Sequence, residues 1–329
     1  MRRVLTFPLT LLALLGCTFL FMKIAPIDPT LAVTGEKASE AARLAAAQTL
    51  GLDQPWPVQF ARHLGRVMTG DLGVSTLSGQ DVLSDLALAF PATIELALAA
   101  TLIGFGIGLP LGVAGAYWRG RWPDHLARLV ALLGHSVPVF WLGLMALYIF
   151  YAALGWMPGP GRISFYLEGL APRISGFILL DSLLAGRLDI ASDALAHLVL
   201  PALTLGLFTS ALFARTSRAL ILDALGQDFI LTARAKGLSE GRVVFGHALR
   251  ASAAPLATTL ALALCSLLEG SVLTETVFSW PGLGSYMTGA LMAADMAAIL
   301  GGTILIGLVV AGLNLLADMM QRRLDPRTA

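Results

Sequence analysis

The chain has 329 residues, of which 57% are hydrophobic and only 13% are charged. Soluble domains carry about 25% charged residues, so this composition excludes an ordinary soluble domain and indicates an integral membrane protein. The formal net charge of +1 says little about partners, and we expect the lipid bilayer but no nucleic acid among them. Both cysteines, Cys17 and Cys265, fall in apolar runs, and the histidines are scattered, so we expect no disulfide and no metal site.

The chain begins with two arginines followed by an apolar run that reaches to about residue 25. About 20 apolar residues are enough to cross a bilayer, which predicts an uncleaved first transmembrane helix over 1–25. The alternative is a lipoprotein signal, because Leu14, Leu15 and Gly16 precede Cys17.

Further apolar runs follow without the period-two alternation of barrel strands, so they are expected to be helices. Prolines near the start of several runs suit the first helical turn. The sequence therefore predicts an all-α integral membrane protein with six transmembrane helices, at about 7–25, 92–117, 126–154, 198–221, 255–277 and 296–320.

Basic residues then predict the orientation. With the N-terminus inside, most Lys and Arg residues fall on the cytoplasmic side, whereas the short outer segment 278–295 has none. This asymmetry predicts that both termini are cytoplasmic. The predicted cytoplasmic residues are Arg2, Arg3, Arg119, Arg121, Arg128, Arg215, Arg218, Arg234, Lys236, Arg242, Arg250, Arg322, Arg323 and Arg327.

Four regions follow from this layout: the first helix at 1–25, a small extracytoplasmic subdomain at 26–90, a transmembrane core at 91–320 and a cytoplasmic tail at 321–329. The subdomain combines an alanine-rich helix, a GLDQP turn and a short amphipathic helix near 58–68. The core includes an outer insertion at 155–197, whose apolar piece 177–184 is too short to span and contains Asp181. We expect that piece to be an interfacial or re-entrant helix.

We do not expect this chain to catalyse a reaction by itself. The three lysines, Lys23, Lys37 and Lys236, do not follow glycine, so no phosphate-binding loop is present, and no catalytic residue can be assigned. The run from Gly104 to Gly112 has glycines that favour close helix packing over a dinucleotide site, because it lies inside a predicted span.

Ionisable and polar residues inside spans are costly and often functional. Glu95, Glu269 and Glu275 lie within the predicted second and fifth spans, and Asn314 lies within the sixth. Glu269 is about 14 residues past Pro255, well inside the bilayer at 1.5 Å per residue. Glu269 should therefore face protein or water rather than lipid, and Glu269 and Asn314 are candidates for a translocation path.

The segment 222–254 between the fourth and fifth spans is polar and basic. Its pattern predicts a helix over 223–236, a left-handed stop at Gly237, an N-cap at Ser239 and a second helix to about Arg250. Such a stiff helical hairpin suits docking to another protein, although a solvated loop with extended arginines is the alternative.

The stretch DFILTARAKGLSEGRVVFGHALRASAAPL resembles the cytoplasmic coupling loop of bacterial ABC importer permeases of the dipeptide, oligopeptide and nickel group. The resemblance covers nearly the whole chain, and PRISGFILLDSLLAG is similar to an insertion of the dipeptide-type members. The supporting motifs, in chain order, are APIDPT, GLDQP, GDLG, FPATIELAL, SVPVFWLGL, HLVLPALTLG, ETVFSWPGLG and LDPR.

This resemblance implies a type I, MetI-like permease fold in a bacterial inner membrane. It also implies a second homologous permease subunit, two cytoplasmic ATPase subunits that bind ATP and Mg²⁺, and an extracytoplasmic binding protein that delivers peptides. No cofactor is implied for this chain. The residues implied to contact an ATPase are Ala233, Ala235, Lys236, Gly237, Leu238, Ser239 and Glu240.

The chain departs from the usual pattern at Gly246, Ser252 and Glu269, and Glu269 puts the substrate in question. An importer of nickel or another metal complex is therefore an alternative within the family. An ion-coupled secondary transporter is the alternative from another class, although the inverted repeats typical of that class are not evident.

Overall fold

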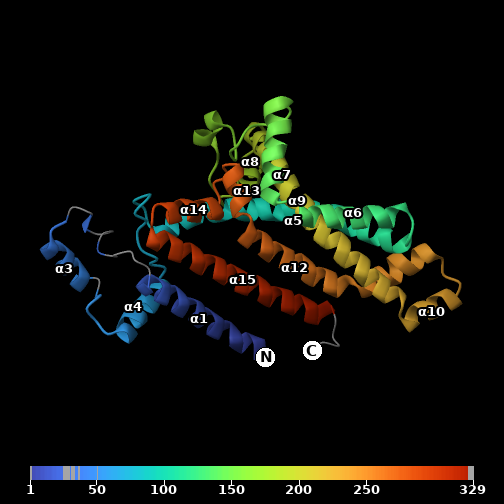
Figure 1. The fold of residues 1–329 in the computed structure, drawn as a ribbon, viewed down its shortest axis with the longest axis horizontal. Coiled ribbons are helices and arrows are strands. Elements are labelled where there is room, and N and C mark those ends of the chain that lie inside the picture. The colour runs from blue at the N-terminus through green and yellow to red at the C-terminus, as the bar shows by residue number, and fades with distance from the viewer. Residues whose placement is uncertain (1, 25–29, 31–33, 36–37, 50, 325–329) are drawn as a thin grey trace. The chain divides into compact units, whose positions relative to one another are not determined.

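The computed structural model describes residues 2–24, 30, 34–35, 38–49 and 51–324, and most of these are helical, with no strand among them (Figure 1). One isolated β-bridge pairs Val74 with Asp81. Residues 325–329 of the predicted tail lie outside the described part.

The elements are α1 (Arg2–Ile24), α3 (Glu40–Thr49), α4 (Trp56–Met68), α5 (Val82–Tyr117), α6 (Trp122–Ser136), α7 (Val139–Ala146), the π-helix η1 (Leu147–Ala153), the 3₁₀-helix η2 (Phe165–Leu170), α8 (Ile178–Leu184), α9 (Leu188–Leu225), α10 (Asp228–Ala235), the π-helix η3 (Arg242–Ala248), α11 (Leu249–Ala251), α12 (Ala253–Gly270), α13 (Val272–Val277), α14 (Leu283–Met292) and α15 (Met296–Leu324).

The chain forms two compact units, 1–90 with 286–312 and 91–285 with 313–329. Within the described residues, four helices are long and apolar enough to cross a membrane: α5, α9, α12 and α15. The α6 and α7–η1 pair would be a fifth span, and the apolar part of α1, Pro8–Ile24, is shorter. The predicted all-α membrane fold is confirmed, whereas the count of six spans stays a prediction.

The prediction of one helix over 126–154 is wrong. The chain turns by 96° between the helices on either side of residues 137–138. Pro138 has no backbone N–H to donate, and it keeps the preceding Val137 extended, with φ −94° and ψ 126°. The predicted span 255–277 is likewise divided, at Ser271, into α12 and α13.

Close packing of α5 on α9 through glycine is confirmed at three positions. A Cβ atom at Gly104 would lie 2.0 Å from the Thr209 hydroxyl, and one at Gly108 would lie 2.5 Å from the Ser210 carbonyl oxygen. A Cβ at Gly112 would lie 1.9 Å from the Ser217 hydroxyl. These distances are too short for any side chain, so the two backbones touch along this seam.

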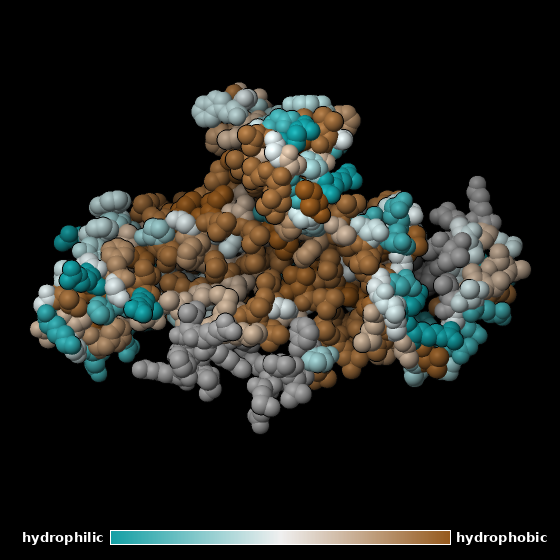
Figure 2. All heavy atoms as spheres, turned by 180° about the vertical axis from the view of Figure 1, so that it is seen from behind, coloured by the Kyte–Doolittle hydropathy of each residue, from teal (hydrophilic) through white to brown (hydrophobic). Residues whose placement is uncertain are grey.

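Large apolar side chains remain on the surface of the spans. Leu98 and Leu102 on α5 and Leu207 on α9 are exposed, and brown hydrophobic residues cover the middle of the face shown in Figure 2. Contiguous apolar surface of this kind is stable only against lipid or another protein. The composition and the surface therefore agree on a membrane location.

The insertion 155–197 contains a buried carboxylate. Asp181 on α8 accepts hydrogen bonds from the backbone N–H groups of Ile174, Ser175 and Gly176 and from the Ser175 hydroxyl, at 2.6–3.0 Å. Burial opposes its ionisation, but these donors hold the pKa of Asp181 below its usual value. Asp181, whose charge is unfavourable in a membrane-spanning helix, thus orders the turn before α8.

Candidate functional site

The polar segment 222–254 has the predicted helix, glycine stop and second helix. Gly237 has φ +77°, and its N–H donates to the Arg234 carbonyl oxygen at 2.9 Å. The left-handed conformation explains the glycine, because other residues rarely adopt it. From residue 240 the chain is helical again through η3 and α11 to Ala251.

The start of the first helix differs from the prediction. Instead of a helix from 223, α9 continues to Leu225, and α10 begins only at Asp228. Gln227 between them is extended, with φ −86° and ψ 153°, which breaks the helix. The hairpin is therefore joined to α9, the longest described helix, by a two-residue break.

An apolar cluster fastens the hairpin to two long helices. Ile230 and Ala233 from α10 are buried with Val243 and Val244 from η3. The same cluster contains residues near the ends of the spans: Val113 and Ala116 of α5, and Ile221 and Ala224 of α9. Burial of such side chains contributes roughly 1.5–3 kcal/mol for each large one, so the hairpin and these helix ends form one packed body.

The seven residues implied to contact an ATPase fall into two groups. Ala233 is buried and Leu238 is half-buried against the apolar cluster, so these two serve the attachment of the hairpin. The other five are exposed in the described chain: Ala235, Lys236, Gly237, Ser239 and Glu240.

A salt bridge that sequence reasoning did not single out closes the hairpin turn. The Arg234 guanidinium donates to both carboxylate oxygens of Glu240, at 2.8 and 3.0 Å. The hydrogen bonds from Arg234 lower the pKa of Glu240 and raise the pKa of Arg234. Both side chains are largely exposed, so the pair sets geometry more than stability.

A second ion cluster lies at the same end of α5, α6 and α9. The Asp124 carboxylate on α6 is fully buried and accepts from Arg218 of α9 at 2.6 Å, from Arg128 at 2.9 Å and from the Gly120 N–H at 3.0 Å. Arg218 lies one turn before Ile221 of the apolar cluster. Asp124 therefore ties α6 to the helix that carries the hairpin.

The motif ETVFSWPGLG contributes to a buried cluster of hydrogen-bonded polar groups. The Glu275 carboxylate accepts from the hydroxyls of Thr93 and Ser271, at 2.8 and 2.9 Å, and from the Ser285 N–H at 3.0 Å. A Cβ at Gly282 would lie 2.6 Å from that carboxylate, so only glycine fits there. Glu275 thus stabilises the packing of these segments. Its position in a predicted span alone did not reveal this structural role.

Glu95 also has a structural partner. Arg162 of the insertion 155–197 donates to Glu95 at 2.6 and 3.0 Å, and the Leu179 N–H donates to the other Glu95 oxygen at 3.0 Å. The two charged side chains are 8% and 10% exposed. Arg162 further donates to the Gly176 carbonyl oxygen at 2.8 Å and lies 5.8 Å from the centre of the Trp280 ring.

The two predicted path residues are placed differently. Glu269, next to the last residue of α12, and Asn314 on α15 are both exposed. Within the described chain no hydrogen bond or ion pair holds either side chain. Both are accessible to water or to another subunit, and their role stays a prediction.

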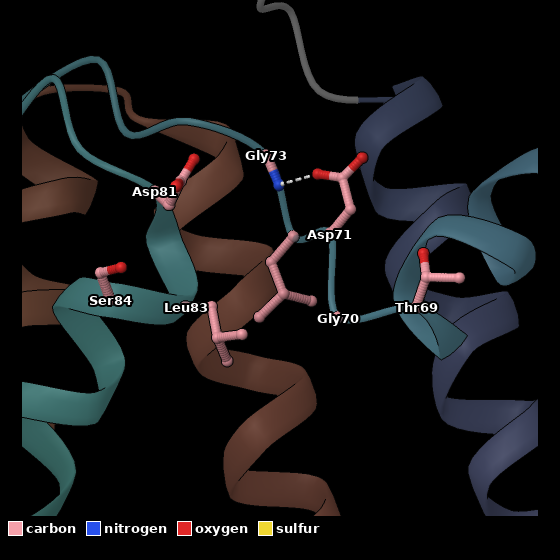
Figure 3. A pocket seen from close by; sticks show the side chains of 8 residues that line it. Thr69, Gly70, Asp71, Gly73, Asp81, Leu83 and Ser84 are labelled. Atoms are coloured by element: carbon pink, nitrogen blue, oxygen red, sulfur yellow. Dashed lines mark hydrogen bonds between the residues drawn. The ribbon is translucent and has the colours of Figure 1, made fainter.

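The GDLG motif lines a cavity of about 360 Å³ in the unit 1–90 with 286–312. The Gly73 N–H donates to Asp71 at 3.0 Å, and the cavity is also lined by Asp81, just before α5, and by Ser84 in its first turn (Figure 3). The described residues contain no group of three or more metal-ligating side chains. Two carboxylates, those of Asp71 and Asp81, line this cavity.

Two family models match the chain. One, described as binding-protein-dependent transport system inner membrane component, matches residues 106–329, and its N-terminal companion matches residues 1–97. In structure, the chain is similar to one in the inward-facing MetNI methionine ABC transporter, with a TM-score of 0.50 and 20% identity, covering 71% of this chain and 93% of that one. That likeness concerns the fold.

Three curated relatives align over most of their length. The probable D,D-dipeptide transport system permease protein DdpB of Escherichia coli is 43% identical over 94% of this chain and 91% of its own. The di/tripeptide permease DppB of Pseudomonas aeruginosa is 39% identical, over 94% and 92%. The glutathione permease GsiC of Salmonella paratyphi A is 34% identical, over 99% and 97%.

Proposed function

Because the chain belongs to the family of binding-protein-dependent transport system inner membrane components, we propose that it is the permease subunit of an ATP-driven importer of di- and oligopeptides. The family consists of transport permeases, so the chain is a multi-pass inner-membrane transport protein and not an enzyme. The observation that carries the peptide assignment is the 43% identity to a D,D-dipeptide permease over 94% of the chain. The names of these relatives favour neither a nickel importer nor a secondary transporter.

ATP is bound and hydrolysed, with Mg²⁺, by two partner ATPase subunits at the cytoplasmic surface. The exposed hairpin residues from Ala235 to Glu240 dock there, and the apolar cluster transmits their movement to α5 and α9. A second permease subunit completes the path, and an extracytoplasmic binding protein delivers the peptide. Both termini face the cytoplasm in this arrangement, as the basic residues favour. The chain supplies a bistable path that the ATPases switch.

Uptake into proteoliposomes containing all the subunits tests this function. Labelled dipeptide uptake should require ATP, and excess unlabelled dipeptide should abolish it whereas chelated nickel should leave it unchanged. The reason is that the path and the binding protein recognise a peptide rather than a metal complex. ATP-independent uptake driven by a proton gradient, or competition by chelated nickel alone, would overturn the assignment.

In the same assay, Glu269→Gln reports on the path. An exposed carboxylate in a path of low dielectric attracts cations, so its removal should slow uptake of lysine-containing dipeptides more than of neutral ones. Asn314→Ala is the companion variant. Equal rates for wild type and both variants with every peptide would remove these residues from the path.

Gly237 gives a sharp test of the coupling hairpin. No atom lies within 4 Å of a Cβ built at Gly237, so its φ of +77° rather than space excludes other residues. Gly237→Val should therefore lower peptide-stimulated ATPase activity at least about fivefold, because β-branched residues are strained there by about 1–3 kcal/mol. Gly237→Asn should keep most of the activity, since asparagine tolerates the left-handed region.

The comparison of these two variants separates conformation from size. Valine and asparagine have similar volumes, so a loss with both would point to steric contact at the docking surface. Full activity with Gly237→Val would show that this turn takes no part in coupling.

A further inference from the structure

A second cavity lies between α1 and α4, within the unit 1–90 with 286–312. Its volume is about 470 Å³, and its lining combines the apolar side chains of Phe19 and Met22 with Gln59, Arg62, His63 and Arg66. Phe19 is buried, and its ring packs edge-on against Phe60 with the ring centres 5.4 Å apart. The cavity thus has an apolar wall from α1 and a basic wall from α4.

The basic wall has unused donors. His63 is 8% exposed, and its Nε2 atom has no hydrogen-bond partner in the described part of the chain. Such a buried polar atom costs free energy unless a ligand or water satisfies it. Burial and the neighbouring Arg66 lower the pKa of His63, which favours the neutral ring with one N–H to donate.

The two arginines are exposed and can pair with an anion. Arg62 and Arg66 lie one turn apart on α4, and no ion pair joins either to a carboxylate among residues 51–324 or the described N-terminal segments. Arg62 lies against the turn after α3, where a Cβ at Gly51 would be 2.2 Å from its guanidinium. That turn can hold Arg62 close because Gly51 has no side chain and has φ +67°.

The surroundings of this cavity have the residue types that are common where a membrane meets water. Leu20 and Phe21 are exposed on α1, which ends at Ile24, and Lys23 near that end donates to Gln59 of the cavity. Trp56 is exposed at the start of α4. An apolar helix with a lysine near its end and an exposed tryptophan beside it are typical of the interfacial layer.

We propose that this cavity binds the phosphate group of an anionic phospholipid. Arg62 and Arg66 neutralise the phosphate, His63 Nε2–H donates to one of its oxygens, and the lipid chains lie along the exposed apolar side of α1. Arginine suits this role because its planar fork matches phosphate oxygens. The apolar wall favours a lipid over free inorganic phosphate as the source of the phosphate.

Native mass spectrometry of the detergent-purified full chain tests this site with phosphatidylglycerol and phosphatidylcholine of identical acyl chains. We expect one phosphatidylglycerol to be retained at least about tenfold more strongly than phosphatidylcholine. The double variant Arg62→Gln/Arg66→Gln should lose this preference. Both side chains are exposed, so the double variant should fold, which its elution profile and melting temperature will show.

Arg173→Gln is the matched control, because it removes an exposed arginine of the other unit. It should retain phosphatidylglycerol like the wild type. Equal retention of both lipids by the wild type, or undiminished preference in the double variant, would overturn the proposal. Displacement of phosphatidylglycerol by millimolar inorganic phosphate would overturn the lipid assignment, because the cavity would then recognise phosphate alone.

Discussion

Gly112→Ala is expected to destabilise the protein more than any other single-methyl change in α5. The added Cβ would lie 1.9 Å from the Ser217 hydroxyl, 2.5 Å from the Ala214 carbonyl oxygen and 2.9 Å from the Arg218 N–H nitrogen. Two of these atoms belong to the α9 backbone and cannot rotate away, so the helices must separate. Overpacking of this kind costs about 1–3 kcal/mol, and we expect the upper part of that range.

Thermal unfolding of the purified chain in detergent measures this effect. The melting temperature of Gly112→Ala should fall by roughly 2–4 °C for each kcal/mol lost. Because the seam lies beside the helix ends that carry the coupling hairpin, ATP-driven uptake should fall as well.

Gly106→Ala is the control from the same helix. No atom outside the helix lies within 4 Å of a Cβ at Gly106, so the change adds a methyl group without a clash. Alanine also has a higher helix propensity than glycine, by about 1 kcal/mol in water, so this variant should be as stable as the wild type or more stable. Equal destabilisation by both changes would contradict close packing as the reason for these glycines.

Arg162→Met is expected to have the second large effect. It removes the cation that the Glu95 carboxylate meets at 2.6 Å, and it leaves the Glu95 side chain, which is only 10% exposed, without that cation. Removing one partner of a buried ion pair costs about 3–5 kcal/mol, because the remaining charge has no compensation. The insertion 155–197 should then detach from α5, and limited proteolysis should cut at its loops at lower protease concentration.

The double variant Arg162→Met/Glu95→Gln distinguishes a lost charge from lost volume. Glutamine is neutral, and its side-chain oxygen can still accept from the Leu179 N–H that now donates to Glu95 at 3.0 Å. We expect the double variant to recover more than half of the lost stability and the wild-type proteolysis pattern. If it is as unstable as Arg162→Met alone, packing of the Arg162 side chain against Trp280 rather than charge is what matters.

Much of this fold could be predicted from short stretches of the sequence. Apolar runs of sufficient length predicted the spans, and a glycine between two helical patterns predicted the left-handed stop at Gly237. The bend at Val137 and Pro138 was also readable, since proline restricts the residue before it, but the length of the apolar run suggested a continuous helix. Signals of this kind depend on a few neighbouring residues, which is why one sequence is enough to interpret them.

The candidate site could be predicted only in part from such short stretches of sequence. The sequence located the hairpin and its glycine, but it could not show that Ala233 faces the apolar cluster whereas Ala235 is exposed. That distinction depends on which side of α10 packs on α5 and α9. The Arg234–Glu240 pair likewise needed the geometry of the turn, because several charges of either sign lie nearby in the sequence.

By itself, the sequence determined that the chain is an all-α membrane protein, where its polar hairpin lies and which motifs it shares with transport permeases. Only the tertiary structure decided which glycines of α5 touch α9, and that Glu95 and Glu275 are held by Arg162 and Thr93 far away in the chain. The physical reason is the distance along the chain over which each effect acts. Hydrophobic periodicity and backbone preference act within one or two helical turns, whereas the partner of a buried charge is selected by the packing of helices that the sequence keeps apart.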